Sequence, residues 1–131
     1  MTADRLAAIY RGYIACLNAQ DWPDLGRFVD DDVQRNGVRL GLAGYRALLE
    51  GDFRAIPDLR FNIAGLVVQP PHVAARLRFD CTPAGALFGL AVNGRRVSFD
   101  EHAFYEFRGG RIVQVRSVID VAAIAAQLDG A

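Results

Sequence analysis

The segment FDEHAFYEFRGGRIV, residues 99–113, has the form of two strands joined by a tight turn. Its pair of adjacent glycines supplies the positive φ angles that such a turn requires. Aromatic and β-branched residues extend the pattern on both sides, which predicts a long strand over residues 95–107 and a last strand over residues 111–119. An alanine-rich run at residues 121–128 then predicts a short C-terminal helix.

Two further strands are predicted before this hairpin. Residues 73–81 alternate cleanly between apolar side chains on one face and charged side chains on the other. Residues 59–68 alternate at first and then become continuously apolar, and Pro70-Pro71 separates the two strands. The segment 82–93 is rich in glycine and small apolar residues, which is typical of a loop.

The first half of the chain has mainly helical patterns. Apolar residues recur at intervals of three and four from position 2 to position 20, with Thr2 as the expected N-cap. Pro23 suits the first turn of a second, short helix, and residues 41–54 restore the helical spacing. Between these helices, Asn36-Gly37 predicts the turn of a small hairpin.

Helices that precede a meander of long antiparallel strands indicate an α+β fold rather than alternating βαβ units. We expect one domain over residues 1–131, because this length and a hydrophobic content of 52% suit a single core. N-terminal helices packed on a curved antiparallel sheet would form a cone. The open end of such a cone is a natural place for a small ligand.

The composition excludes several classes of function. Fifteen basic residues balance fifteen acidic ones, so we expect binding to neither nucleic acid nor an anionic membrane. Cys16 and Cys81 have no CxxC spacing and no histidine cluster beside them, which argues against a disulfide framework and against a metal site. No leader pattern and no apolar run of about 18 residues is present, so we expect a cytoplasmic protein.

The hairpin of residues 99–113 is continued by Val118-Ile119-Asp120 and by Gln127-Leu128. This stretch resembles the C-terminal half of SnoaL-like polyketide cyclases, members of the nuclear transport factor 2-like superfamily. The order of a long helix, Asp21-Trp22, a short helix and Asp31-Asp32-Val33 is similar to that superfamily too. The resemblance covers nearly the whole chain, and its specific part is the stretch 99–128. It implies a barrel-like α+β cone, a homodimer and an activity that needs neither metal nor cofactor.

The resemblance also implies a reaction. In polyketide cyclases of the family, an aspartate near the end of the last strand removes a proton from carbon and so starts an intramolecular aldol ring closure. Asp120 matches that aspartate by its place in the motif. Family members often carry a tryptophan four residues earlier, where this chain has Arg116. An arginine there changes the charge of the expected pocket and calls a polyketide substrate into question.

Each candidate for the chemistry has two interpretations. Asp120 is either the N-cap of the last helix or a general base, and the second role needs its carboxylate to face the apolar interior. His102, in mid-strand, either assists as an acid or hydrogen-bond donor or pairs with a neighbour across the sheet. Arg116 shares the parity of Asp120 if no bulge intervenes, and it either binds an anionic substrate or neutralises the aspartate.

Five more residues are candidates for binding the substrate. Trp22 and Tyr13 offer amphipathic side chains on the helices, and Phe104 lies on the predicted long strand. Asn36 either offers its amide to a carbonyl or serves as a left-handed turn residue. Phe88, on the glycine-containing loop, is a candidate for a lid that excludes water.

The leading hypothesis is a cofactor-independent enzyme of polyketide cyclase type. It would act on a small, mostly apolar carbonyl compound by proton abstraction from carbon, leading to intramolecular aldol closure or isomerisation, with Asp120 as base and His102 assisting. The alternative is a binding module of the same fold that holds a small hydrophobic ligand or serves as a dimeric scaffold. A third hypothesis is another enzyme built on this cone, an isomerase or a dehydratase.

Overall fold

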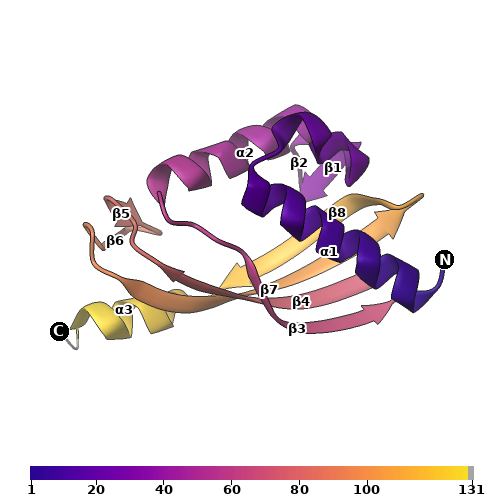
Figure 1. Ribbon diagram of the computed structural model, residues 1–131. Coiled ribbons are helices and arrows are strands. Elements are labelled where there is room, and N and C mark those ends of the chain that lie inside the picture. Colours follow the sequence, from indigo (N-terminus) through magenta and orange to yellow (C-terminus); the bar gives the residue numbers. More distant parts are fainter. Residues whose placement is uncertain (130–131) are drawn as a thin grey trace.

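The computed structural model describes residues 1–129 and shows two long helices packed over one face of a curved sheet (Figure 1). A short 3-10 helix connects the first of them to the first strand, and a third α-helix follows the last strand. The helices are α1 (Ala3–Ala19), η1 (Trp22–Arg27), α2 (Gly41–Ala55) and α3 (Val121–Asp129). The strands are β1 (Val29–Arg35), β2 (Val38–Arg39), β3 (Asn62–Gln69), β4 (His72–Cys81), β5 (Ala86–Leu87), β6 (Leu90–Ala91), β7 (Val97–Arg108) and β8 (Arg111–Ile119).

Six strands form the main sheet, in the order β2-β1-β8-β7-β4-β3. Strand β1 runs parallel to β8, and the other neighbouring strands are antiparallel. The segment predicted as a loop contains the small ribbon β5-β6. The sheet is curved and not closed, and helices cover its concave side (Figure 1). The predicted α+β cone is therefore confirmed, with one parallel pairing that the sequence pattern did not indicate.

Helix α1 begins and ends where its sequence predicts. The Thr2 hydroxyl oxygen accepts a hydrogen bond from the backbone N–H of Arg5 at 3.1 Å, and Gln20 ends the helix in the left-handed region with φ of 52°. Its buried face presents Leu6, Tyr10, Tyr13 and Leu17 to the sheet. None of the helices within residues 1–129 combines the length and the hydropathy that a membrane span requires.

The two faces of β7 differ sharply in burial. Phe99, Ala103, Tyr105 and Phe107 are buried on the concave face, toward α1 and α2, whereas Phe104 is 61% exposed on the opposite face. Period-two alternation therefore places every odd-numbered residue of this strand in the interior. His102 lies on the same outer face as Phe104.

A β-bulge interrupts β8 and reverses which of its residues face inward. Glu106 pairs with Gln114 and Phe107 pairs with Ile112, so Val113 is the extra residue. Before the bulge the even-numbered Ile112 is buried, and after it the odd-numbered residues Val115, Ser117 and Ile119 face inward. The bulge therefore separates Ile112 from the parity that Arg116 and Asp120 share, and this parity faces outward: Val118, which belongs to it, is 70% exposed.

Candidate functional site

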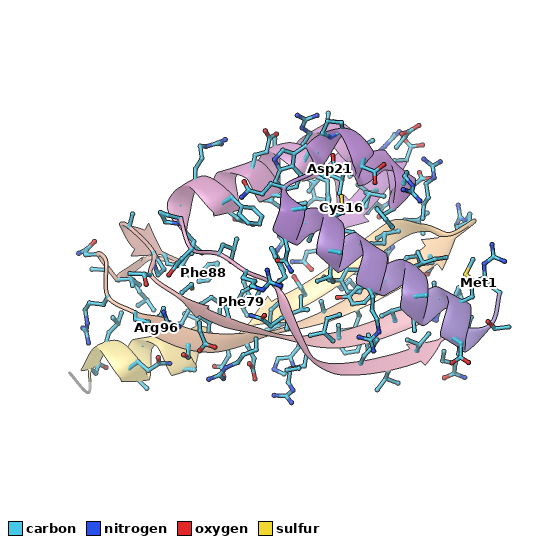
Figure 2. The ribbon with its side chains drawn as sticks, viewed as in Figure 1. Met1, Cys16, Asp21, Phe79, Phe88 and Arg96 are labelled. Atoms are coloured by element: carbon cyan, nitrogen blue, oxygen red, sulfur yellow. The ribbon has the colours of Figure 1, made fainter. Side chains whose placement is uncertain are left out.

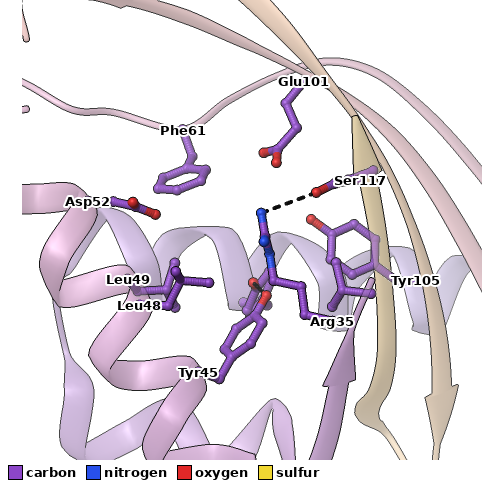
Figure 3. Close-up of a pocket in the computed structure, with 12 residues that line it drawn as sticks. Arg35, Tyr45, Leu48, Leu49, Asp52, Phe61, Glu101, Tyr105 and Ser117 are labelled. Atoms are coloured by element: carbon purple, nitrogen blue, oxygen red, sulfur yellow. Dashed lines mark hydrogen bonds between the residues drawn. The ribbon is translucent and has the colours of Figure 1, made fainter. Parts of the chain in front are cut away.

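Two adjoining hollows lie between α2 and the concave face of the sheet. The inner one has a volume of about 40 Å³, and the outer one, which opens toward β5 and β6, has a volume of about 190 Å³. The same five side chains line both, so the hollows form one cavity with a shared wall: Arg35, Leu48, Asp52, Phe61 and Glu101. Figure 3 shows these side chains, which come from β1, α2, β7 and the segment before β3.

Tyrosine hydroxyls surround the inner end of the cavity. The hydroxyl oxygens of Tyr13 and Tyr45 are 2.6 Å apart, and Tyr10 donates to Tyr105 at 3.2 Å. Tyr13, Tyr45 and Tyr105 line the inner hollow, but Tyr10 does not. Burial raises the pKa of Tyr45 to about 12 and also raises the pKa of Tyr10, Tyr13 and Tyr105, so all four hydroxyls stay protonated at neutral pH.

Three charged side chains meet at the shared wall. Burial raises the pKa of Glu101 above that of an ordinary glutamate, although the Ser117 hydroxyl and the Arg35 guanidinium act in the opposite direction. Burial likewise raises the pKa of Asp52, again against the effect of Arg35. Arg35 Nη2 donates to Ser117 Oγ at 3.4 Å. For both carboxyl groups, desolvation thus raises the pKa by more than the positive charge of Arg35 lowers it.

The outer end of the cavity is apolar and aromatic. Phe79 stacks on Phe99 with ring centroids 5.2 Å apart, and Phe61 meets Phe79 edge-on at the same separation. Phe88 stands edge-on to Phe99 at 6.3 Å and is 48% exposed. Figure 2 shows Phe79 and Phe88 below the C-terminal end of α2. A ligand in this cavity would hold an apolar ring at the mouth and a polar group at the tyrosine end.

Two of the predicted site residues, Tyr13 and Phe88, line the cavity. Trp22 packs edge-on against Phe53 at 5.8 Å and lines a different surface hollow, beside Pro23. Asn36 has a positive φ of 49° in the β1-β2 turn, so its interpretation as a left-handed turn residue is confirmed.

The Asn36 amide is engaged with the backbone of β8. Its Oδ1 accepts from the Ser117 N–H at 2.9 Å, and its Nδ2 donates to the Ser117 carbonyl oxygen at 3.4 Å. It therefore holds β8 in place from outside the cavity, rather than offering its amide to a substrate carbonyl.

Asp120 does not face the interior, contrary to the placement expected for a base. Its side chain is exposed, and Oδ1 accepts a hydrogen bond from the backbone N–H of Ala123 at 3.1 Å. This is the geometry of an N-cap for α3. The strand ends directly before Asp120, and the bulge at Val113 has already turned this parity of β8 outward.

His102, Phe104 and Arg116 share the outer face of the sheet. Phe104 pairs with Arg116 across β7 and β8, His102 pairs with Val118, and Arg116 Nε donates to Gln114 Oε1 at 3.3 Å. The structure therefore brings these three together, but on the side of the sheet opposite the cavity. They were expected around a substrate, but the alternation of β7 and the bulge in β8 turn all three side chains away from the cavity.

Sequence reasoning missed Glu101, Arg35 and Asp52, although one signal for Glu101 was present. Phe99, Ala103 and Tyr105 form an apolar row at odd positions of the predicted strand, and Glu101 is the one acid within that row. A lone carboxylate on a buried face is a typical functional candidate. Across residues 1–129 no three potential metal ligands cluster together, and Cys16 and Cys81 are both free thiols.

Comparison with known proteins agrees with this architecture. The family model described as SnoaL-like polyketide cyclase matches residues 7–128. A SnoaL-like polyketide cyclase from Agrobacterium tumefaciens is 50% identical and has a TM-score of 0.94, over 98% of this chain and 99% of that one.

More distant structures share the fold. TsrD from Streptomyces laurentii is 21% identical with a TM-score of 0.84, covering 98% of this chain and 97% of its own. IdmH from Streptomyces antibioticus is 19% identical with a TM-score of 0.81, covering 95% and 98%. No curated protein matches the sequence. The family match over nearly the whole chain and the close Agrobacterium relative show that this protein belongs to the SnoaL-like polyketide cyclase family.

Proposed function

We propose that this protein is a cofactor-independent enzyme that removes a proton from a carbon next to a carbonyl group in a small, mostly apolar compound. One observation carries the proposal: the carboxyl group of Glu101, with its raised pKa, lies at the junction of a polar inner hollow and an aromatic mouth. The family supports a cyclase-type role in general. The identity of the base is inferred from the geometry of the cavity.

Glu101 suits the role of base better than Asp120 or Asp52. Desolvation raises its pKa, which brings its proton affinity closer to that of a weakly acidic carbon. It lies on the central strand β7 and is half-buried, whereas Asp52, on α2, shares the same wall but is more exposed to solvent. Asp120 is occupied with the N-cap of α3 and lines neither hollow.

The proposed step moves one proton and three electron pairs, the first being a lone pair of the Glu101 carboxylate, which forms the new O–H bond. The Glu101 carboxylate takes a proton from the carbon next to the carbonyl, and the C–H electron pair becomes the double bond of an enolate. The carbonyl π pair moves to oxygen, which acquires the negative charge. In ring closure, the enolate re-forms its carbonyl as its carbon attacks a second carbonyl of the same molecule, and the resulting alkoxide takes the proton back from Glu101. In an isomerisation, the substrate carries a neighbouring double bond, so the intermediate is a conjugated dienolate, and protonated Glu101 returns the proton to its distant carbon.

Arg35 offsets the negative charge that this step concentrates in the cavity. Its guanidinium contacts Ser117 and lowers the pKa of both Glu101 and Asp52. A fixed cation in a site that excludes water stabilises a developing oxyanion more strongly than the same charge does in solvent. Arg35 thus favours the ionised form of Glu101 and the negatively charged intermediate.

The test is exchange of the α-protons of acetophenone and 1-indanone in deuterated buffer, followed by proton NMR. We expect the wild-type protein to catalyse exchange and Glu101→Gln to lose about a hundredfold or more of that rate. Asp120→Asn, which preserves an N-cap, should exchange at the wild-type rate.

Exchange that survives Glu101→Gln and disappears in Asp120→Asn would overturn the assignment and restore Asp120 as the base. Saturable binding of either ketone without exchange would overturn the enzymatic proposal, and the binding-module hypothesis would then describe the protein.

A further inference from the structure

The ribbon β5-β6 is held firmly at the outer end of the cavity. Its two strands pair with each other, and Phe88 and Gly89 form the turn between them. At the base of the ribbon, the Ala84 N–H donates to the carbonyl oxygen of Ala55, the last residue of α2, at 3.1 Å. Leu87, next to the turn, is buried in the core. The position of Phe88 is therefore fixed by the surrounding structure.

The backbone at Phe88 has a conformation that suits other residue types better. Phe88 and Gly89 have φ angles of 51° and 78°, and a two-residue turn with two positive φ angles favours Asn-Gly or Asp-Gly. The same chain uses that favoured pair in its other short hairpin, where Asn36 and Gly37 have φ angles of 49° and 80°. A side chain as bulky as phenylalanine is uncommon in the left-handed region, and such strain is concentrated at functional positions. The outlier points to a role for the aromatic ring itself.

The ring of Phe88 forms the outer boundary of the cavity. It lines the outer hollow, stands edge-on to Phe99 at 6.3 Å and is 48% exposed, so one side faces the hollow and the other faces solvent. Phe79 and Phe99 line the hollow from the sheet, and Leu48 lines it from α2. Glu101 lies in the wall shared with the inner hollow. A ligand in the outer hollow is thus confined between Glu101 and Phe88.

The volume of this space matches one ring. The outer hollow has about 190 Å³, which is slightly more than the roughly 150 Å³ of a cavity that binds one benzene molecule. It is well below the roughly 300–1,000 Å³ of pockets that hold drug-sized ligands. The inner hollow adds about 40 Å³, which leaves room for one small substituent. A second fused ring would need the space that the Phe88 side chain fills.

We propose that Phe88 is a specificity-determining residue, whose side chain restricts the substrate to carbonyl compounds with a single six-membered ring. This inference rests on the proposed function, because the ring must fill the outer hollow while the carbon next to the carbonyl reaches Glu101. Ketones with two or more fused six-membered rings are excluded by size.

Binding of two ketones that differ by one fused ring tests the proposal without requiring any chemistry. Acetophenone and 2-acetonaphthone carry the same acetyl group, and protein NMR titration gives a Kd for each. Because overpacking is costly, we expect the wild-type protein to bind acetophenone roughly tenfold to a hundredfold more tightly. Phe88→Ala should reverse this preference, since the added space lets the larger apolar surface of 2-acetonaphthone be buried.

Two variants separate the proposed role from other effects of the substitution. Phe104→Ala is the matched control, because it removes an exposed phenylalanine from the outer face of the sheet and should keep the wild-type preference. Phe88→Asn removes the ring but suits a left-handed turn, so it should bind the ketones as Phe88→Ala does and melt at a higher temperature than Phe88→Ala. A wild-type preference that persists in Phe88→Ala or Phe88→Asn would overturn the proposal, as would tighter binding of 2-acetonaphthone by the wild type.

Ketone exchange separates this inference from the proposed function. Size selection that depends on Phe88, in a protein that exchanges neither ketone, would support the specificity role and refute proton abstraction. Exchange of both ketones at equal rates by the wild type, lost in Glu101→Gln, would support proton abstraction and refute the size limit. Absence of binding for both ketones in the wild type would refute both proposals.

Discussion

Replacing Asp120 with alanine should destabilise the protein without disabling the cavity. The change removes the oxygen that accepts from the Ala123 N–H at the start of α3. Loss of such an N-cap costs about 1 kcal/mol in proteins. The helix stays docked, because Ile124 is fully buried and Gln127 exchanges two hydrogen bonds with the Ser98 backbone. The expected effect is a weakened first turn rather than a detached helix.

The expected melting shift follows from the length of the chain. The unfolding entropy near the melting temperature is about 2.1 cal/mol/K per residue, which gives roughly 0.3 kcal/mol/K for a chain of this size. A cap worth about 1 kcal/mol therefore corresponds to a fall in Tm of about 4 °C. Differential scanning calorimetry measures this shift, and amide hydrogen exchange at Ala123 should accelerate with it.

Asp120→Asn is the matched control, because asparagine caps helices about as well as aspartate. It should melt within about 1 °C of the wild type. A Tm unchanged in Asp120→Ala, or equally lowered in both variants, would contradict the capping role and the argument that excludes Asp120 from the chemistry.

Two further predictions concern the charge cluster and the outer face. Ketone exchange needs ionised Glu101, so its rate should rise with pH through a pKa above that of an ordinary glutamate. Arg35→Gln removes the cation that lowers this pKa, so the pH–rate profile should move to higher pH. A profile that moved to lower pH would contradict the proposed interaction of Arg35 with Glu101. We also propose that the outer face is covered by a second copy of the chain, since Phe104 and Val118 are 61% and 70% exposed there. Phe104→Arg should convert a dimer into a monomer in sedimentation velocity, and a monomeric wild type would refute this proposal.

Local sequence signals were sufficient to predict most of the fold. The glycine pair at 109–110 has φ angles of 59° and 79°, and Asn36-Gly37 forms the predicted hairpin turn. The clean alternation of residues 73–81 became β4, with buried and exposed side chains in the predicted phase. These features depend on backbone sterics and on one buried face, both of which a short stretch of sequence encodes.

The site could not be predicted in the same way, because it depends on which face of each strand turns inward. One extra residue, Val113, reverses which side chains of β8 face inward after it. No local sequence pattern predicts a bulge at this position. Of the two interpretations of Asp120, the structure shows the N-cap of the last helix, and the bulge explains why the carboxylate does not face the interior. On β7 the apolar row at odd positions indicates that Glu101 faces inward, and the same alternation places His102, the predicted assisting residue, on the opposite face.

Arg35 and Asp52 were beyond local reasoning altogether. Arg35 is the last residue of a short, acid-rich strand, a pattern typical of an exposed hairpin. Asp52 lies near the end of a helix, at a position that is typical of a solvent-exposed side chain. Only the packing of α2 over the sheet and the pairing of β1 with β8 bring them to the same wall as Glu101. Such convergence is a property of tertiary structure.

The parallel pairing of β1 with β8 has a consequence for how such a protein can diversify. The cation of the cavity sits on a peripheral hairpin held by Asn36, whereas the proposed base sits on the innermost strand of the scaffold. Sequence drift in the hairpin can therefore displace or delete the positive charge while the framework around the base survives intact. Descendants of one ancestral chain can in this way acquire different acidities at a common catalytic position, and hence different reactions, without rebuilding their cores.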